Sequence, residues 1–202
     1  MFFPPVYVWV KLFKHEHILF NTSDVYRKQT WRNRCRILGP NKVQDLIIPI
    51  THASKHNAMQ SVMPDHKEPW INHHLKSLQT AYGKSPFYEY YKDDLAILYR
   101  QFNNKTLAEI NIKSVSFCLK KLRMPADIST VTGLQKINND HLLNLNSYLS
   151  NIYPPKNFMQ LPYNQVFGNV FVSGLSILDA LFCLGPQAAD YIFRHSDYTL
   201  EP

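Results

Sequence analysis

The sequence is short of the residues that most often carry recognisable chemistry. Among its 202 residues only 3 are cysteine and 6 are glycine. Cys35, Cys118 and Cys183 are odd in number and lie far apart, so they predict neither a disulfide framework nor a thiolate zinc site. The glycines form neither a GxGxxG fingerprint nor a P-loop, which excludes nucleotide binding by these two motifs. This cysteine usage predicts a reducing, cytoplasmic setting.

Long apolar runs and metal-binding motifs are also absent. No run approaches the roughly 20 apolar residues that cross a bilayer. At the start of the chain, MFFPPVYVWVKLFKHEH, the charges follow the apolar stretch, whereas a secretory signal has them before it. The histidine pairs His15/His17 and His52/His56 have no HExxH and no cysteine partner beside them. We therefore expect no membrane span, no metal site and no cofactor.

Acidic residues are scarce in the first part of the chain. Residues 1–60 hold 9 of the 22 lysines and arginines but only 3 of the 15 acidic residues, so they carry +6 of the net charge of +7. Such a local basic region favours an anionic small molecule, a phosphate or a nucleic acid as partner. The remaining 142 residues carry +1, which leaves no extended electropositive track and disfavours a nucleic acid.

Strand-like segments dominate the N-terminal third. Residues 2–13 are predicted as a strand or short helix, and residues 17–20 as a short buried strand. Two further runs, 36–38 and 43–50, flank the turn residues 39–41 and predict a β-hairpin.

From residue 69 the apolar spacing becomes helical. An apolar stripe predicts a first helix between Pro69 and Gly83. Ser85-Pro86 is typical of a helix start and predicts a second helix, and a third is expected over residues 108–122. The first stripe consists of Ile71, Leu75, Leu78 and Tyr82.

The last third is less regular. Residues 126–162 are polar and rich in asparagine, with a weak helical segment at 141–149. We expect a strand over residues 166–172 and helices over 176–184 and 188–193.

These patterns predict an α/β fold. A mixed sheet is expected largely from residues before 52, with several helices packed on it. A composition of 45% hydrophobic and 18% charged residues is that of a globular chain, and its length suits a single domain over residues 1–202.

A basic segment is the first candidate site. Five cations, Arg27, Lys28, Arg32, Arg34 and Arg36, fall within ten residues without an acidic residue among them. In an extended chain Arg32 and Arg34 would share a face and grip a phosphate or carboxylate, while Asn33 would point the other way. The alternative is a solvated basic strand or loop. We take Lys28, Arg32, Asn33 and Arg34 as the candidate substrate-binding residues.

Adjacent histidines on the first predicted helix differ in their surroundings. His74 adjoins the apolar stripe, whereas His73 falls on the side of Lys76 and Thr80. A neutral His74 could act as a catalytic base. The alternative is a structural histidine hydrogen-bonded at the edge of the core.

A third group of candidates precedes and opens the 176–184 helix. Asp179 follows Ser176 in an SxxD pattern, which favours a helix capping box and leaves a catalytic role as the alternative. Tyr163 and Gln165 are candidates to bind a sugar hydroxyl or a base edge.

Three stretches together resemble the WbqC-like family, named for a protein encoded among bacterial O-antigen synthesis genes. They are YRKQTWRNRCRI (Tyr26–Ile37), WINHHLKSLQTAYGKSPFYEYYKDDL (Trp70–Leu95) and YNQVFGNVFVSGLSILDALFCLGP (Tyr163–Pro186). The family's Trp-x-x-x-His pattern falls on Trp70 and His74. Longer members begin with His-Gln-Pro and carry an additional α/β stretch before the Gln-Val-Phe box, and this sequence has neither.

The resemblance implies a pathway, surface-polysaccharide biosynthesis, but no established reaction. One hypothesis is a transferase that moves an acyl or aminoacyl group to an activated sugar, with the arginines holding an anionic substrate and His74 as base. A second is a noncatalytic partner protein of a biosynthetic complex, which the missing His-Gln-Pro segment favours. A nucleic-acid-binding protein is the third and least favoured.

Overall fold

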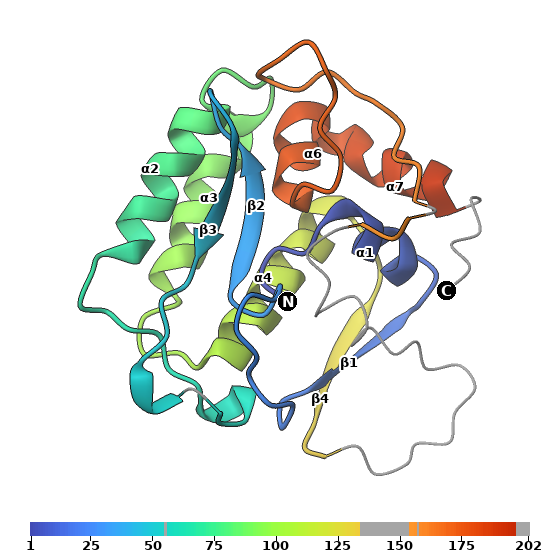
Figure 1. Cartoon of the computed structure of the whole chain (residues 1–202). Coiled ribbons are helices and arrows are strands. Elements are labelled where there is room, and N and C mark those ends of the chain that lie inside the picture. Colours follow the sequence, from blue (N-terminus) through green and yellow to red (C-terminus); the bar gives the residue numbers. More distant parts are fainter. Residues whose placement is uncertain (55, 134–153, 157, 197–202) are drawn as a thin grey trace.

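A computed structural model describes residues 1–54, 56–133, 154–156 and 158–196, and confirms the predicted α/β fold (Figure 1). Its helices are α1 (Val6–Leu12), α2 (Trp70–Tyr82), α3 (Tyr88–Arg100), α4 (Leu107–Leu122), α6 (Ile177–Leu184) and α7 (Ala188–Ser196). Its strands are β1 (His17–Asn21), β2 (Arg34–Leu38), β3 (Val43–Ile47) and β4 (Asp127–Val131). Short 3-10 turns occur at η1 (His52–Ser54), η2 (Met59–Ser61) and η3 (Gly185–Gln187).

The strands form two small sheets, one antiparallel and one parallel. β2 and β3 make the predicted hairpin, in which Cys35 lies opposite Leu46. β1 pairs in parallel with β4, with Ile18 opposite Ile128. β4 lies in the segment that was predicted to be a polar connector, so this strand was missed. The chain between β1 and β4 forms the hairpin and the helices α2, α3 and α4, which is how two parallel strands become neighbours.

The N-terminal apolar segment forms a helix at its centre. Every residue of α1 except Lys11 is buried, as expected of a helix that is covered on all sides. α1 packs against α6 and α7. Pro4 and Pro5 precede the helix and Pro5 is extended, so the proline pair delays the helix start.

α2 begins and ends where predicted, but its buried face is displaced. Trp70, His74 and Leu78 are buried, whereas Ile71 and Leu75 are only half-buried. α3 begins at Tyr88, later than the predicted start at Ser85-Pro86.

Local hydrogen bonds explain two helix ends. The Ser85 hydroxyl donates to the Tyr82 carbonyl at 2.7 Å, so it closes α2 and does not cap α3. At α4, the Thr106 side chain and Glu109 form a reciprocal capping box. That helix ends at Leu122, before Pro125, because Arg123 adopts the left-handed conformation.

The C-terminal third corrects two predictions. Residues 166–172 are described and form no strand. At α6 the Ser176 hydroxyl accepts from the Leu178 amide at 3.2 Å and so caps the helix, but the Asp179 carboxylate bonds elsewhere and the predicted capping box does not form. The predicted helix at 141–149 lies outside the described residues.

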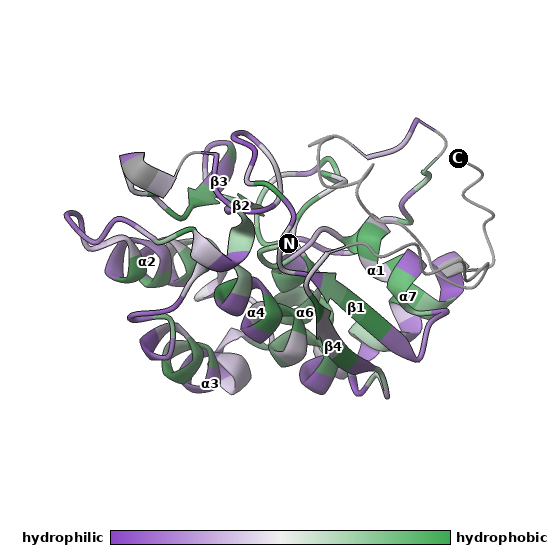
Figure 2. Ribbon diagram, turned by 90° about the horizontal axis from the view of Figure 1, so that it is seen from below, coloured by the Kyte–Doolittle hydropathy of each residue, from purple (hydrophilic) through white to green (hydrophobic). Residues whose placement is uncertain are grey.

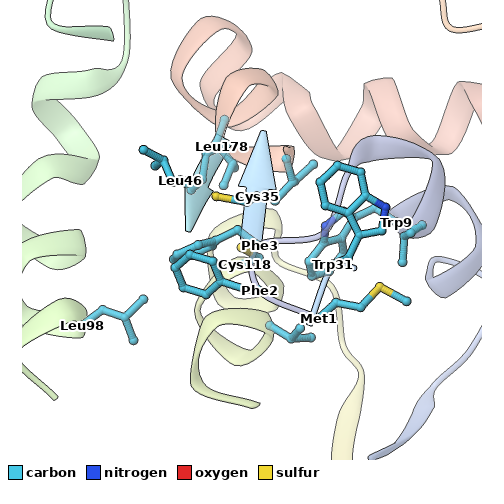
Figure 3. Close-up of a cluster of buried hydrophobic side chains, with 14 of the residues drawn as sticks. Met1, Phe2, Phe3, Trp9, Trp31, Cys35, Leu46, Leu98, Cys118 and Leu178 are labelled. Carbon is cyan, nitrogen blue, oxygen red and sulfur yellow. The ribbon is translucent and has the colours of Figure 1, made fainter. Parts of the chain in front are cut away.

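The core joins elements that are far apart in the sequence. Phe2, Phe3 and Trp9 from the first residues meet Cys35 of β2 and Leu178 of α6 (Figure 3). The hairpin lies between α2 and α3 on one side and α6 on the other, and it contacts both α2 and α6 (Figure 1). α2 and α3 carry both apolar and hydrophilic residues, as expected of helices with one buried face (Figure 2). Among the described residues, no helix combines the length and apolarity needed to cross a membrane.

Candidate functional site

An open cleft of about 600 Å³ runs along the β2–β3 hairpin. One wall is the hairpin, and the other comes from the loop that leads to α6. The cleft therefore joins the predicted basic segment to the predicted site segment near Asp179. Its lining residues are Arg36, Lys42, Val43, Gln44, Asp45, Val172 and Ser173.

Strand alternation places Arg34 and Arg36 on one face of β2, while Cys35 between them is buried on the other face. Asp45 lies directly opposite Arg36 on β3. Its two carboxylate oxygens accept from Arg36 Nε at 2.9 Å and from Arg34 Nη1 at 3.2 Å. The Arg36 guanidinium also lies 5.6 Å from the centre of the Trp31 ring. Arg36 is therefore held in place at the cleft, and this face keeps a net positive charge.

Arg32 has different surroundings. It precedes β2 in a turn, so the alternation that relates Arg34 to Arg36 does not extend to it. Its side chain is buried, and its Nε and Nη2 donate to Asp24 Oδ2 at 3.0 and 2.5 Å. Arg32 and Arg34 nevertheless both lie near Tyr26, where they oppose the rise in phenol pKa that burial causes. A shared anion-accepting surface of Arg32 and Arg34 stays a prediction.

The other two residues of the predicted basic site lie away from the cleft. Asn33 is buried, and its Nδ2 donates to the Ile48 carbonyl at 2.9 Å, which ties the start of β2 to the end of the hairpin. Lys28 is exposed in a turn. Neither Asn33 nor Lys28 is among the described residues that line the cleft.

Asp179 is fully buried and gathers three hydrogen-bond donors. Its Oδ1 accepts from the Tyr82 hydroxyl at 2.9 Å, and its Oδ2 accepts from Gln165 Nε2 at 3.0 Å and from the Tyr163 hydroxyl. Burial raises the pKa of Asp179, and the three donors oppose that rise. The structure thus brings together three of the predicted site residues, Tyr163, Gln165 and Asp179.

Tyr82 was predicted only as part of an apolar stripe, and its polar role was missed. The Tyr82 hydroxyl accepts from the Leu38 amide at 3.2 Å as well as donating to Asp179, so it links β2 to α6. The available signal was its residue type, because a buried tyrosine hydroxyl needs a polar partner.

Gln165 connects the Asp179 group to the cleft. Its side-chain amide makes two hydrogen bonds to the backbone of Val172, each of 2.9 Å. On the other wall, the Ser176 amide donates to the Arg36 carbonyl at 2.8 Å. Both walls of the cleft are therefore attached to the start of α6.

His74 lies in an aromatic part of the core, not in the cleft lining. Its Nε2 is 3.0 Å from the Ile47 carbonyl and its Nδ1 is 3.3 Å from the Tyr99 hydroxyl, while Trp70 packs against the ring. Burial lowers the pKa of His74 to about 4, so the ring is neutral at pH 7. His73 is exposed. The structure buries His74 and exposes His73, but it does not place His74 in the described cleft lining, and the functional role of His74 stays a prediction.

Potential metal ligands and thiols do not add a second site within the described part of the chain. There, no three histidine, cysteine, aspartate or glutamate side chains gather as metal ligands would. The three cysteines are free and buried. Burial raises the pKa of each thiol, that of Cys183 to about 12, so the thiols stay protonated at neutral pH.

The model of the WbqC-like protein family matches residues 1–152. The chain belongs to this family. The match includes the stretches Tyr26–Ile37 and Trp70–Leu95 of this chain and ends before Tyr163. No curated protein and no solved structure matches the chain.

Proposed function

We propose that this WbqC-like protein binds a phosphorylated or nucleotide-activated sugar in the hairpin cleft, and that it acts in bacterial surface-polysaccharide biosynthesis in the cytoplasm. The observation that carries the proposal is the placement of Arg36. Asp45 and the Trp31 ring hold its guanidinium at the cleft, which Lys42 also lines. A fixed guanidinium loses little conformational entropy when it binds phosphate, and a lysine adds a second positive charge.

The remaining lining residues suit the rest of such a ligand. The Gln44 amide and the Ser173 hydroxyl can exchange hydrogen bonds with sugar hydroxyls. Val43 and Val172 offer apolar contacts to a sugar ring or a base. The volume of about 600 Å³ falls within the range of small-molecule sites.

Acyl or aminoacyl transfer to an amino sugar is the reaction that we propose for this site. It needs a base to take a proton from the attacking amine or hydroxyl. The candidate is the neutral imidazole of His74, which is buried outside the described cleft lining and would have to become accessible from the cleft. Lost turnover with an unchanged fold in His74→Gln would support this role. Intact turnover with a lower melting temperature would refute it.

One observation favours the second hypothesis, a noncatalytic partner protein. Both ring nitrogens of His74 and both carboxylate oxygens of Asp179 already take part in internal hydrogen bonds. A base that is committed in this way must give up a partner before it can accept a proton from a ligand. Binding without catalysis would leave these contacts in place.

Calorimetric titration with UDP-N-acetylglucosamine tests the binding proposal. Lys42 and Lys28 are both exposed lysines of the predicted basic region, but only Lys42 lines the cleft. We expect Lys42→Gln to weaken binding about tenfold, which corresponds to about 1.4 kcal/mol, and Lys28→Gln to leave it unchanged. Absence of binding by the wild type, or equal loss in both variants, would contradict the proposal.

A salt titration with a single-stranded oligonucleotide separates this function from nucleic-acid binding. A nucleic-acid-binding protein would bind tightly and lose affinity steeply as salt rises, because it releases counterions from several phosphates.

A further inference from the structure

One wall of the cleft is held by a side chain where a strand would ordinarily do so. Val172 lies outside regular secondary structure. Its amide donates to Gln165 Oε1 at 2.9 Å, and its carbonyl accepts from Gln165 Nε2 at 2.9 Å. The glutamine amide thus imitates the donor and acceptor pair of a neighbouring strand.

The Gln165 amide has a defined orientation. Its Nε2 donates to Asp179 Oδ2 at 3.0 Å as well as to Val172. An ionised carboxylate only accepts hydrogen bonds, so it selects the orientation that turns the NH2 group towards Asp179. A reversed amide would place two acceptors against each other at Asp179. It would also place two donors, and two acceptors, against each other at Val172.

The Asp179 carboxylate also accepts hydrogen bonds from two tyrosine hydroxyls. The Tyr82 hydroxyl donates to Oδ1 and the Tyr163 hydroxyl to Oδ2. With three donors around it, the charged form is the one that satisfies every neighbour, although burial alone would favour the neutral acid. Asp179 lies behind the cleft and is not among its described lining residues.

We infer that Gln165 and Asp179 are positioning residues that set the shape of the ligand cleft. Gln165 holds Val172 and thereby the adjoining Ser173, and Asp179 adds to the Val172 backbone in fixing the orientation of Gln165. Neither residue touches the ligand. The ligand part of this inference rests on the proposed function, whereas the link from Asp179 through Gln165 to Val172 does not.

Amide hydrogen exchange of the unliganded protein tests the link directly. In Gln165→Leu we expect the Val172 amide to exchange at least tenfold faster, while core amides of α2 and α4 keep their protection. Asp179→Asn should have a smaller effect at Val172 in the same direction, because an asparagine NH2 turned towards Gln165 opposes its Nε2, while the two hydrogen bonds to Val172 still favour the present orientation. If Asp179 acted through packing alone, this isosteric change would leave the exchange of the Val172 amide unaltered. Gln79→Leu, at an exposed glutamine of α2, is the matched control.

Three outcomes would overturn the inference. They are unchanged Val172 exchange in Gln165→Leu, faster exchange throughout the chain, and unchanged Val172 exchange in Asp179→Asn. Titration of the same variants with UDP-N-acetylglucosamine then tests the ligand part, and we expect about a tenfold loss of affinity. If the wild type fails to bind this probe, the proposed function fails while the exchange result still decides the link. Faster Val172 exchange with wild-type affinity would refute control of the cleft.

Discussion

At neutral pH the surroundings of His74 keep its imidazole uncharged. The Ile47 carbonyl can only accept a hydrogen bond, so Nε2 carries the proton and Nδ1 accepts from the Tyr99 hydroxyl. Protonation would add a charge in an aromatic environment and break the bond from Tyr99. This is the physical reason why the pKa of His74 falls from 6.5 to about 4.

The lowered pKa of His74 predicts acid sensitivity. In the unfolded chain His74 binds a proton below about pH 6.5, whereas in the folded protein it does so only below about pH 4. The contribution of the neutral His74 to stability is therefore complete above pH 6.5 and is lost as the pH falls through 4. The contribution is on the order of 3 kcal/mol. Urea denaturation of the wild type at about pH 7, 5.5 and 4 should show this decline.

His74→Gln should flatten the decline, because glutamine does not titrate, and should lower stability at neutral pH. The matched variant His73→Gln changes the exposed neighbour and should keep most of the wild-type pH dependence, because burial is the main cause of the lowered His74 pKa and the charge of His73 a lesser one. His195, whose pKa burial also lowers, contributes equally to both variants and cancels in the comparison. Equal slopes for the two variants would show that His74 does not cause the acid sensitivity.

Residue-scale prediction from the sequence succeeded where a local rule applied. Helical geometry separated His74 from His73, because neighbours on a helix face different directions. The partners of Asp179 could not be predicted, since Tyr82 lies 97 residues away in sequence and helix periodicity describes only one element at a time. The SxxD pattern at Ser176 favoured a capping box, but the Asp179 carboxylate bonds Tyr82 and Gln165 instead.

At the scale of elements, the start of α4 is stabilised by hydrogen bonds between residues that are neighbours in the sequence. The Thr106 hydroxyl accepts from the Glu109 amide at 3.3 Å, and the Glu109 carboxylate accepts from the Thr106 amide at 2.8 Å. Two amides that the helix leaves unpaired are satisfied in this way.

Thr106→Ala should therefore destabilise the protein by about 1 kcal/mol, because alanine cannot accept from the Glu109 amide. In a chain of this length the melting temperature should fall by about 2–4 °C. Thr80→Ala, on the exposed side of α2, is the control and should change the melting temperature less. A larger effect at Thr80 than at Thr106 would argue against the capping box as a source of stability.

The elements that sequence patterns predicted well are those with a strong period or a clear turn. The β2–β3 hairpin and α6 appear at their predicted places because turn residues and glycine delimit them. β4 was missed because its five residues alternate too briefly to stand out from a polar segment, and its pairing with β1 is a tertiary contact. The strand expected at 166–172 does not form, and at its last residue, Val172, the backbone N–H and C=O bond the Gln165 side chain and not a partner strand.

For the whole molecule, the first residues of the chain connect the helical layer to the hairpin. Phe2 and Phe3 are fully buried, and the Phe2 amide donates to the Trp31 carbonyl at 2.9 Å. The Phe2 ring packs near Tyr99 of α3 and Phe102, and the Phe3 ring near Phe117 of α4 (Figure 3 shows Phe2 and Phe3). These contacts bring α3 and α4 onto the segment that leads into α1.

This central position predicts a global effect of truncating Phe2. Phe2→Ala removes a fully buried aromatic ring and leaves a cavity beside His74 and Tyr99, so we expect a loss of about 3–5 kcal/mol in the free energy of unfolding. Phe193→Ala, at a ring that is 53% exposed on α7, should cost far less. Both are measured by urea denaturation, where an unchanged dependence on urea concentration would show that the change lies in stability and not in compactness. If the loss at Phe2 were no larger than at Phe193, the N-terminal segment would lie on the fold without supporting it.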